Sequence, residues 1–187
     1  MNGTTFKSGK VGQAFSFDGE DDYVNIPASV SLDITETITI SAWVLHNGEF
    51  EEHYPGFQTI LAKGDSTYRL SLCSQESPQW WNCNGHSFMF ALSQCPDIDL
   101  PSRIVPEPNR WYHVVGTYDG SQARIYIDGN LANSMLCSGP IPINSYDVGI
   151  GENTEWTERH WPGQLDEVQI YNRALSAKEI QTIYFGE

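Results

Sequence analysis

Hydrophobic and polar residues alternate with a period of two along most of this chain. The pattern is clearest in the segment ITISAWV at residues 38–44, which is also rich in β-branched residues. Successive side chains of a β-strand point to opposite faces, so this period predicts strands with one buried face. Further strands are predicted by the same reasoning at residues 14–17, 23–27, 59–62, 68–72, 88–92, 112–118, 123–127, 131–135, 148–151 and 164–171.

Turn sequences separate these segments at intervals of about 8–12 residues, as in all-β domains. Asp-Gly pairs at residues 119–120 and 128–129 are typical of tight hairpins, because Gly adopts positive φ angles without steric cost. One helix is predicted at residues 177–184, where Ser176 and Glu179 have the spacing of a capping box. The pattern therefore predicts a two-sheet sandwich or a barrel, in a single domain over residues 1–187.

Five segments resemble, in order, the signatures of the laminin-G-like, concanavalin A-like domain family. They lie at residues 17–24, 40–44, 110–120, 125–129 and 163–176, within a region of roughly residues 11–184. The resemblance implies an all-β jelly roll, which is an antiparallel two-sheet β-sandwich, with a short C-terminal helix. It also implies a domain that binds glycans or proteins, is usually non-catalytic and often accompanies secreted polysaccharide-degrading enzymes.

The charge balance narrows the classes of partner. The 187 residues include 10 Lys and Arg against 24 Asp and Glu, which gives a formal net charge of −14. Duplex nucleic acids and anionic membranes both require a basic surface, so this balance argues against either partner. It is compatible with calcium, a neutral ligand or a cationic partner. No apolar run is long enough to cross a bilayer as a helix.

Four cysteines, Cys73, Cys83, Cys95 and Cys137, have spacings that match no common zinc site. They are either free buried thiols in a cytosolic protein or two disulfides in an extracellular one. The turn-like sequence around three of them favours disulfides, with the pairing Cys73–Cys83 and Cys95–Cys137. The predicted location is therefore extracellular, as a secreted or cell-surface protein.

Carboxylates crowd the predicted turn at residues 18–22, with Asp18, Asp21 and Asp22 among them. Calcium binds several hard oxygen ligands at once, and a tight turn supplies both carboxylates and carbonyls. The alternative is a solvated acidic turn that keeps the sheet edge soluble. In similar domains a structural calcium often joins the first Asp-Gly turn to an Asp near the chain end, here Asp18 and Asp166. Structural Ca²⁺ is therefore the expected cofactor, with Asp21 or Asp22 as further ligands.

Three long polar loops, at residues 46–58, 74–86 and 152–161, contain aromatic residues that core packing does not explain. Proteins hold sugar rings with an exposed aromatic platform and a few polar groups for the hydroxyls. Trp161, just before the last strand, is expected to pack in the interior instead. The candidate ligand-binding residues are Tyr54, Trp80, Trp81, Asn84, Trp156, Arg159 and His160.

Catalytic motifs of related glycoside hydrolases are absent, since the chain has no Glu-x-Asp-x-Glu run. Asp166 and Glu167 are adjacent and should point to opposite faces. Asp97 and Asp99 have suitable spacing, but the flanking prolines indicate an irregular loop. The sequence therefore predicts a monomeric, non-catalytic carbohydrate-binding module for a neutral poly- or oligosaccharide, with a catalytic domain of the parent protein as a further partner. The alternatives are a protein-interaction or adhesion module and a small polysaccharide hydrolase or lyase.

Overall fold

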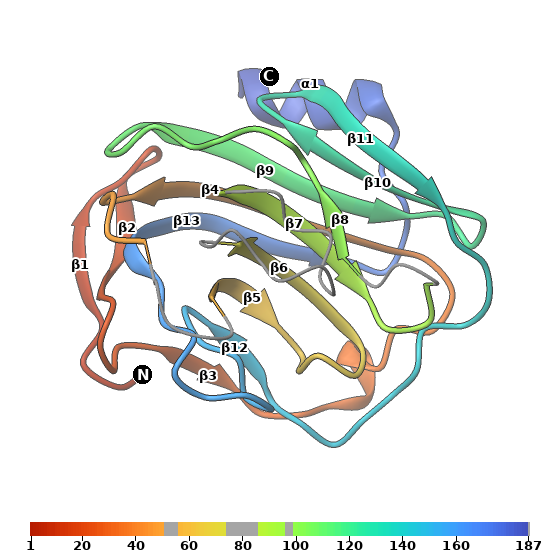
Figure 1. Cartoon of the computed structure of the whole chain (residues 1–187), viewed down its shortest axis with the longest axis horizontal. Helices are drawn as coiled ribbons and strands as arrows, with labels where there is room; N and C mark the ends of the chain where they lie inside the picture. Colours follow the sequence, from red (N-terminus) through yellow and green to blue (C-terminus); the bar gives the residue numbers. More distant parts are fainter. Residues whose placement is uncertain (51–55, 74–85, 96–98, 187) are drawn as a thin grey trace.

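Two antiparallel β-sheets pack face to face (Figure 1). This computed structural model describes residues 1–50, 56–73, 86–95 and 99–186. The seven-stranded sheet contains, in spatial order, β1 (Thr5–Ser8), β2 (Gln13–Asp18), β13 (Pro162–Tyr171), β4 (Ile38–His46), β9 (Trp111–Tyr118), β10 (Gln122–Ile127) and β11 (Asn130–Leu136). The six-stranded sheet contains β3 (Val24–Ile26), β12 (Val148–Ile150), β5 (Phe57–Ala62), β6 (Tyr68–Cys73), β7 (Ser87–Leu92) and β8 (Asp99–Pro101). The predicted antiparallel two-sheet sandwich with a short C-terminal helix is confirmed.

The hydrophobic core fills the space between the sheets, where alternate residues of facing strands meet. Ile38, Ile40 and Val44 of β4 are fully buried there, as their spacing of two predicts. Phe90 of β7 lies directly against Gly116 of β9, where an added Cβ would come within 2.3 Å of the ring. A glycine at this position therefore lets a large aromatic side chain approach the opposite sheet.

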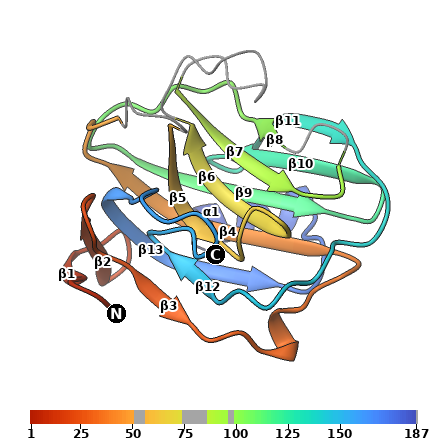
Figure 2. The same cartoon turned by 60° about the horizontal axis from the view of Figure 1, so that its bottom comes forward.

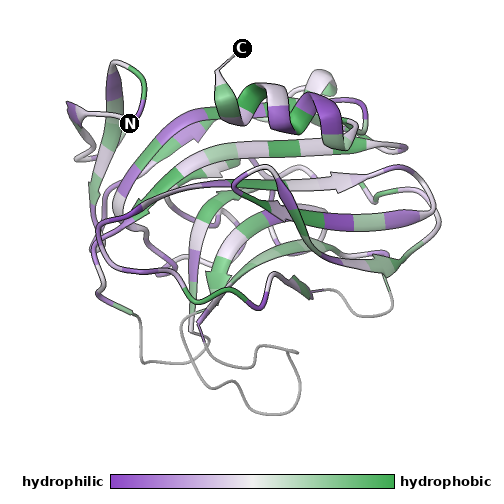
Figure 3. Ribbon diagram, turned by 90° about the horizontal axis from the view of Figure 1, so that it is seen from above, coloured by the Kyte–Doolittle hydropathy of each residue, from purple (hydrophilic) through white to green (hydrophobic). Residues whose placement is uncertain are grey.

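Helix α1 (Ala177–Phe185) covers part of the outer face of the seven-stranded sheet (Figure 3). Its capping box is formed as predicted, since the Ser176 hydroxyl accepts from the Glu179 backbone N–H and the Glu179 carboxylate accepts from Ser176. Ile180 packs with Val115 and Tyr126 on the sheet beneath. Among helices in the described part of the chain, none has the length and apolarity of a membrane span.

Two short strands, β1 and β8, are not predicted by the sequence pattern. β1 is exposed throughout and so shows no alternation, although it pairs with β2. Asp99 was expected in an irregular loop, but it begins β8 and pairs with Ala91 of β7. A carboxylate can occupy this buried strand because Arg69 of β6 forms an ion pair with it. A short 3-10 turn, Val30–Leu32, precedes β4.

The predicted disulfide between Cys95 and Cys137 is confirmed. It joins the segment after β7 to the segment after β11, and therefore links the two sheets. Cys73 is also disulfide-bonded. Its predicted partner, Cys83, lies outside the described residues.

Replacing both Cys95 and Cys137 with alanine should lower the free energy of unfolding by about 4 kcal/mol. The bond closes a chain separation of 42 residues, so it restricts the unfolded chain considerably. Urea unfolding of the double variant, followed by tryptophan fluorescence, measures this loss. A loss below about 1 kcal/mol would show that the bond contributes little beyond the core.

Candidate functional site

A long loop lies along β5 of the six-stranded sheet, between β12 and β13 in the sequence. Residues 151–161 run beside β5 and β12, where they can be followed in blue in Figure 2. The Gly151 backbone N–H donates to the Ile60 carbonyl at 3.2 Å, and the Thr59 N–H donates to the Arg159 carbonyl at 2.9 Å. The loop is thus attached to β5 at both of its ends.

Trp156 projects from this loop with 57% of its surface exposed. The loop beneath it is fixed by Asn153, whose side-chain oxygen accepts the backbone N–H groups of Glu155 and Trp156 at 3.0 and 3.2 Å. Such an Asx turn suits a short polar side chain. The Glu155 carboxylate also accepts from the Ser66 backbone and hydroxyl at 2.9 and 2.8 Å. An exposed indole on a fixed backbone loses little conformational freedom when a ligand stacks on it.

A buried network of charges lies next to Trp156. Arg159 donates to both Asp65 oxygens at 2.8 and 2.9 Å, and Arg69 contacts Asp65 at 2.6 Å. Arg69 also donates to Asp99. The ring of Phe57 lies 5.0 and 5.1 Å from the two guanidinium carbons. Two positive and two negative side chains therefore compensate one another on a face from which water is largely excluded.

The network changes the protonation equilibria of its carboxyl groups. Burial alone would raise the pKa of Asp65, but the charges of Arg69 and Arg159 outweigh burial and lower that pKa below its ordinary value. Burial raises the pKa of Asp99, which Arg69 only partly offsets. Asp65 is therefore the firmly ionised centre of the network, and it fixes both guanidinium groups.

A shallow groove of about 380 Å³ borders the same loop on the side of β3 and β12. Tyr23 and Tyr146 contribute aromatic surface to it, and Thr157 connects it to the neighbouring Trp156. Asn25 donates to Asp147 at 2.7 Å within this groove. The arrangement combines flat apolar rings with hydrogen-bonding groups, which is the chemistry that a sugar ring requires.

The predicted ligand-binding residues differ in how much of each side chain is exposed to solvent. Trp156 is exposed, and Trp161 is fully buried as expected. Arg159 is only 3% exposed, so its side chain holds the loop through Asp65 and offers almost no surface to a ligand. His160 is partly buried, in the same loop. Four further candidates lie outside the described residues, namely Tyr54, Trp80, Trp81 and Asn84.

Asp18, Asp21 and Asp22 form the expected acidic cluster, with carboxylate oxygens within 4.8 Å of one another. Backbone N–H groups, that of Glu20 first, lower the pKa of Asp18. Burial, followed by the charges of Asp18 and Asp21, raises the pKa of Asp22 even though the Asp18 N–H donates to it. Three crowded carboxylates, one of them buried, fit a divalent cation with oxygen ligands.

Asp166 does not join this cluster, in contrast to its expected pairing with Asp18. The strands β2 and β13 are neighbours as anticipated, but Asp18 is in register with Pro162, four positions from Asp166. A strand rises about 3.3 Å per residue, so this register separates the two aspartates by roughly 13 Å. The Asp166 carboxylate instead accepts the backbone N–H groups of Val11 and Glu167 at 2.8 and 2.9 Å.

Comparison with solved structures finds the same fold in several binding domains. Domain 4 of AbnA, an extracellular GH43 arabinanase from Geobacillus stearothermophilus solved with arabinotriose, has a TM-score of 0.73 and 21% identity, over 98% of this chain and 82% of that one. The binding domain of Paraclostridial Mosquitocidal Protein 1 has a TM-score of 0.74 and 15% identity, over 98% and 45%. A protein from Bacteroides ovatus, described as a candidate carbohydrate binding protein, has a TM-score of 0.71 and 20% identity, over 90% and 45%.

Sequence comparison identifies the family. A search of curated proteins gives no match. The model of the Laminin_G_3 family matches residues 18–181, which include the first acidic turn, both hairpins and most of α1. This chain therefore belongs to the concanavalin A-like lectin/glucanase superfamily.

Proposed function

We propose that this protein is a non-catalytic carbohydrate-binding module of an extracellular or cell-surface protein. Family membership, the arabinotriose-bound arabinanase domain and the Bacteroides ovatus protein support this class. The chain spans less than half of the Bacteroides ovatus and mosquitocidal protein chains, so it has the dimensions of one module within a larger protein. The parent protein would then carry a further domain, such as a catalytic one.

The glycan would bind at the Trp156 face, defined as Trp156 together with the groove lined by Tyr23, Tyr146 and Thr157. The observation that carries this proposal is the 57% exposure of Trp156 on a loop whose backbone is fixed by Asn153 and Arg159. The indole would stack on a sugar ring, and the groove would bind hydroxyl groups. The net charge of −14 favours a neutral glycan.

A glycan and polysaccharide array tests this function directly. The purified domain should bind at least one neutral poly- or oligosaccharide, and arabino-oligosaccharides belong in the array because of the arabinanase domain. Failure to bind any glycan in calcium-containing buffer would contradict the proposal and favour a protein partner. A reducing-sugar assay on the same polysaccharides tests the enzymatic alternative, and we expect no turnover.

The same proposal includes a structural Ca²⁺ held by Asp18, Asp21 and Asp22. An ion there would offset the mutual repulsion of these carboxylates in the turn between β2 and β3. Calcium at about 100 times its dissociation constant should stabilise the fold by about 2.7 kcal/mol. The melting temperature should therefore rise on adding calcium and fall on adding a chelator.

Asp21→Asn is the variant of choice, because Asp21 is exposed while Asp22 is buried. It should remove the calcium-induced rise in melting temperature. In chelator, the variant and the unmodified protein should have nearly the same melting temperature. Glu36→Gln removes one exposed carboxylate elsewhere and should keep the full response. Identical melting temperatures for the unmodified protein in calcium and in chelator would argue against the ion.

A further inference from the structure

A second concave site opens at the edge of the sandwich, between β8 of one sheet and β11 of the other. Its volume of about 540 Å³ exceeds that of the groove beside Trp156. This size falls within the range of small-molecule sites. Asn133 of β11 donates to the Pro101 carbonyl of β8 at 2.8 Å, so the two walls are held together without a ligand. We refer to this site as the edge cleft.

The walls of the edge cleft offer both acceptors and donors. Asp99 lines the cleft but is only 4% exposed, and its carboxylate pairs with Arg69. Arg103 lies at the rim in a left-handed conformation, with φ at 61°. Its guanidinium forms no ion pair with any residue that the structure describes, although the chain has 24 acidic residues. Ser134 adds a hydroxyl group and Met135 adds apolar surface. Ser87 also lines the cleft, but it is 2% exposed and its hydroxyl accepts the Arg103 backbone N–H at 2.9 Å.

The charges of the cleft disfavour a cationic ligand. Arg69 balances Asp99, which leaves Arg103 at the rim as a donor for hydrogen-bond acceptors. A guanidinium and a hydroxyl beside apolar atoms suit a polyhydroxylated ring, whose hydroxyls both donate and accept.

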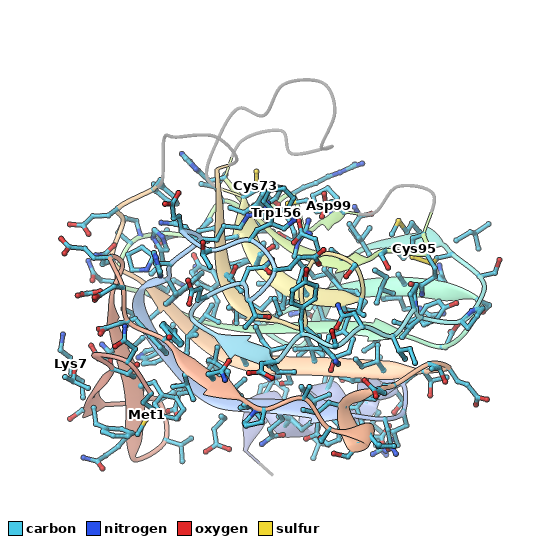
Figure 4. All side chains as sticks on the ribbon, turned by 90° about the horizontal axis from the view of Figure 1, so that it is seen from below. Met1, Lys7, Cys73, Cys95, Asp99 and Trp156 are labelled. Atoms are coloured by element: carbon cyan, nitrogen blue, oxygen red, sulfur yellow. A yellow bond between two sulfur atoms is a disulfide. The ribbon has the colours of Figure 1, made fainter. Side chains whose placement is uncertain are left out.

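The edge cleft is connected to the Trp156 face through the buried network. The Trp156 ring lies 6.0 Å from the guanidinium carbon of Arg159, and Arg159, Asp65, Arg69 and Asp99 contact one another in sequence. Figure 4 shows Trp156 and Asp99 at the same end of the sandwich. The two sites therefore lie at opposite ends of one continuous line of contacting side chains on the six-stranded sheet.

We propose that the edge cleft is a second subsite for the same neutral glycan, so that the domain binds an extended oligosaccharide rather than a single terminal sugar. This inference rests on the proposed function of the Trp156 face. One part of the oligosaccharide would stack on Trp156, and another would place its hydroxyls beside Arg103 and Ser134. Affinity would then increase with chain length until both subsites are filled, because the second contact becomes intramolecular.

The test is calorimetric titration with neutral oligosaccharide ladders, each running from monosaccharide to hexasaccharide and prepared from arabinan, xylan, mannan, galactan and β-glucan. Arg103→Gly removes the guanidinium and tolerates the positive φ of this position. Ser134→Tyr fills the cleft. Lys7→Ala removes an exposed positive charge on distant β1, and Leu136→Tyr adds a ring to the same strand β11 at a side chain that is 81% exposed.

Each cleft variant should lower affinity for the longest bound oligosaccharide about tenfold. Arg103→Gly does so because a hydrogen bond to a charged group is lost, and Ser134→Tyr because the added ring occupies the cleft. Affinity for the shortest ligand and the melting temperature should stay unchanged, and both control variants should behave as the unmodified protein. If chain-length dependence is absent, or persists in both cleft variants, the edge cleft is not a subsite while the Trp156 face stands. If no ladder binds at all, the proposed function fails and this inference with it.

Discussion

Replacing Trp156 with alanine should reduce glycan affinity by about 30-fold or more, while the fold stays intact. Central aromatic anchors of binding sites contribute about 2 kcal/mol or more, which corresponds to this ratio. The indole is 57% exposed, so its removal leaves no internal cavity and the melting temperature should hardly change. Calorimetric titration with the best glycan from the array measures the loss.

Two further variants test whether the loss of affinity comes from the aromatic ring at position 156. Trp156→Phe keeps an aromatic ring and should retain part of the affinity. Leu136→Ala removes an apolar side chain that is 81% exposed on β11 and should leave binding unchanged. Unaltered affinity in Trp156→Ala would show that the glycan, if bound, sits elsewhere on the domain.

Replacing Asp65 with asparagine should destabilise the fold by about 3–5 kcal/mol, since it leaves two buried guanidinium groups without their shared counter-charge. Asp65 contacts both Arg69 and Arg159, whose side chains are 2% and 4% exposed. It also accepts from Asn153, which shapes the turn below Trp156. Urea unfolding measures the stability, and titration should show weaker glycan binding because the loop loses its anchor.

Glu107→Gln is the control for this effect. It also removes one negative charge from an ion pair with an arginine, but the side chains of Arg110 and Glu107 are 50% and 72% exposed. Its cost should be about 1 kcal/mol or less. Equal losses in the two variants would contradict the view that Asp65 is the centre of a buried network.

The fold was predictable because its signals are local. A period of two marks β4, an Asp-Gly pair marks the turn between β9 and β10, and the spacing of Ser176 and Glu179 marks the start of α1. β1 gave no such signal, since an edge strand exposed on both faces needs no alternation. Asp99 was misassigned because the arginine that compensates it lies 30 residues away in sequence.

The site was predictable only in part, because several of its contacts join residues that are far apart in the sequence. Trp156 stands out because acidic and polar neighbours make burial unfavourable. Arg159 was expected to contact sugar hydroxyls, but it ion-pairs with Asp65, which is 94 residues away. Asp166 was expected beside Asp18, and the register of β2 and β13 separates them. Such pairings depend on strand register and loop path, which local patterns do not encode.

Titration followed by ¹H–¹⁵N correlation spectra tests most directly whether this domain binds glycans at the Trp156 face. The indole N–H signal of Trp156 is assigned by its absence in Trp156→Phe. On adding the best neutral oligosaccharide from the array, we expect this signal and the amides of Tyr23, Tyr146 and Thr157 to shift in a saturable manner. Saturable shifts confined to α1 and the outer face of β9 and β10, with Trp156 unaffected, would contradict the account.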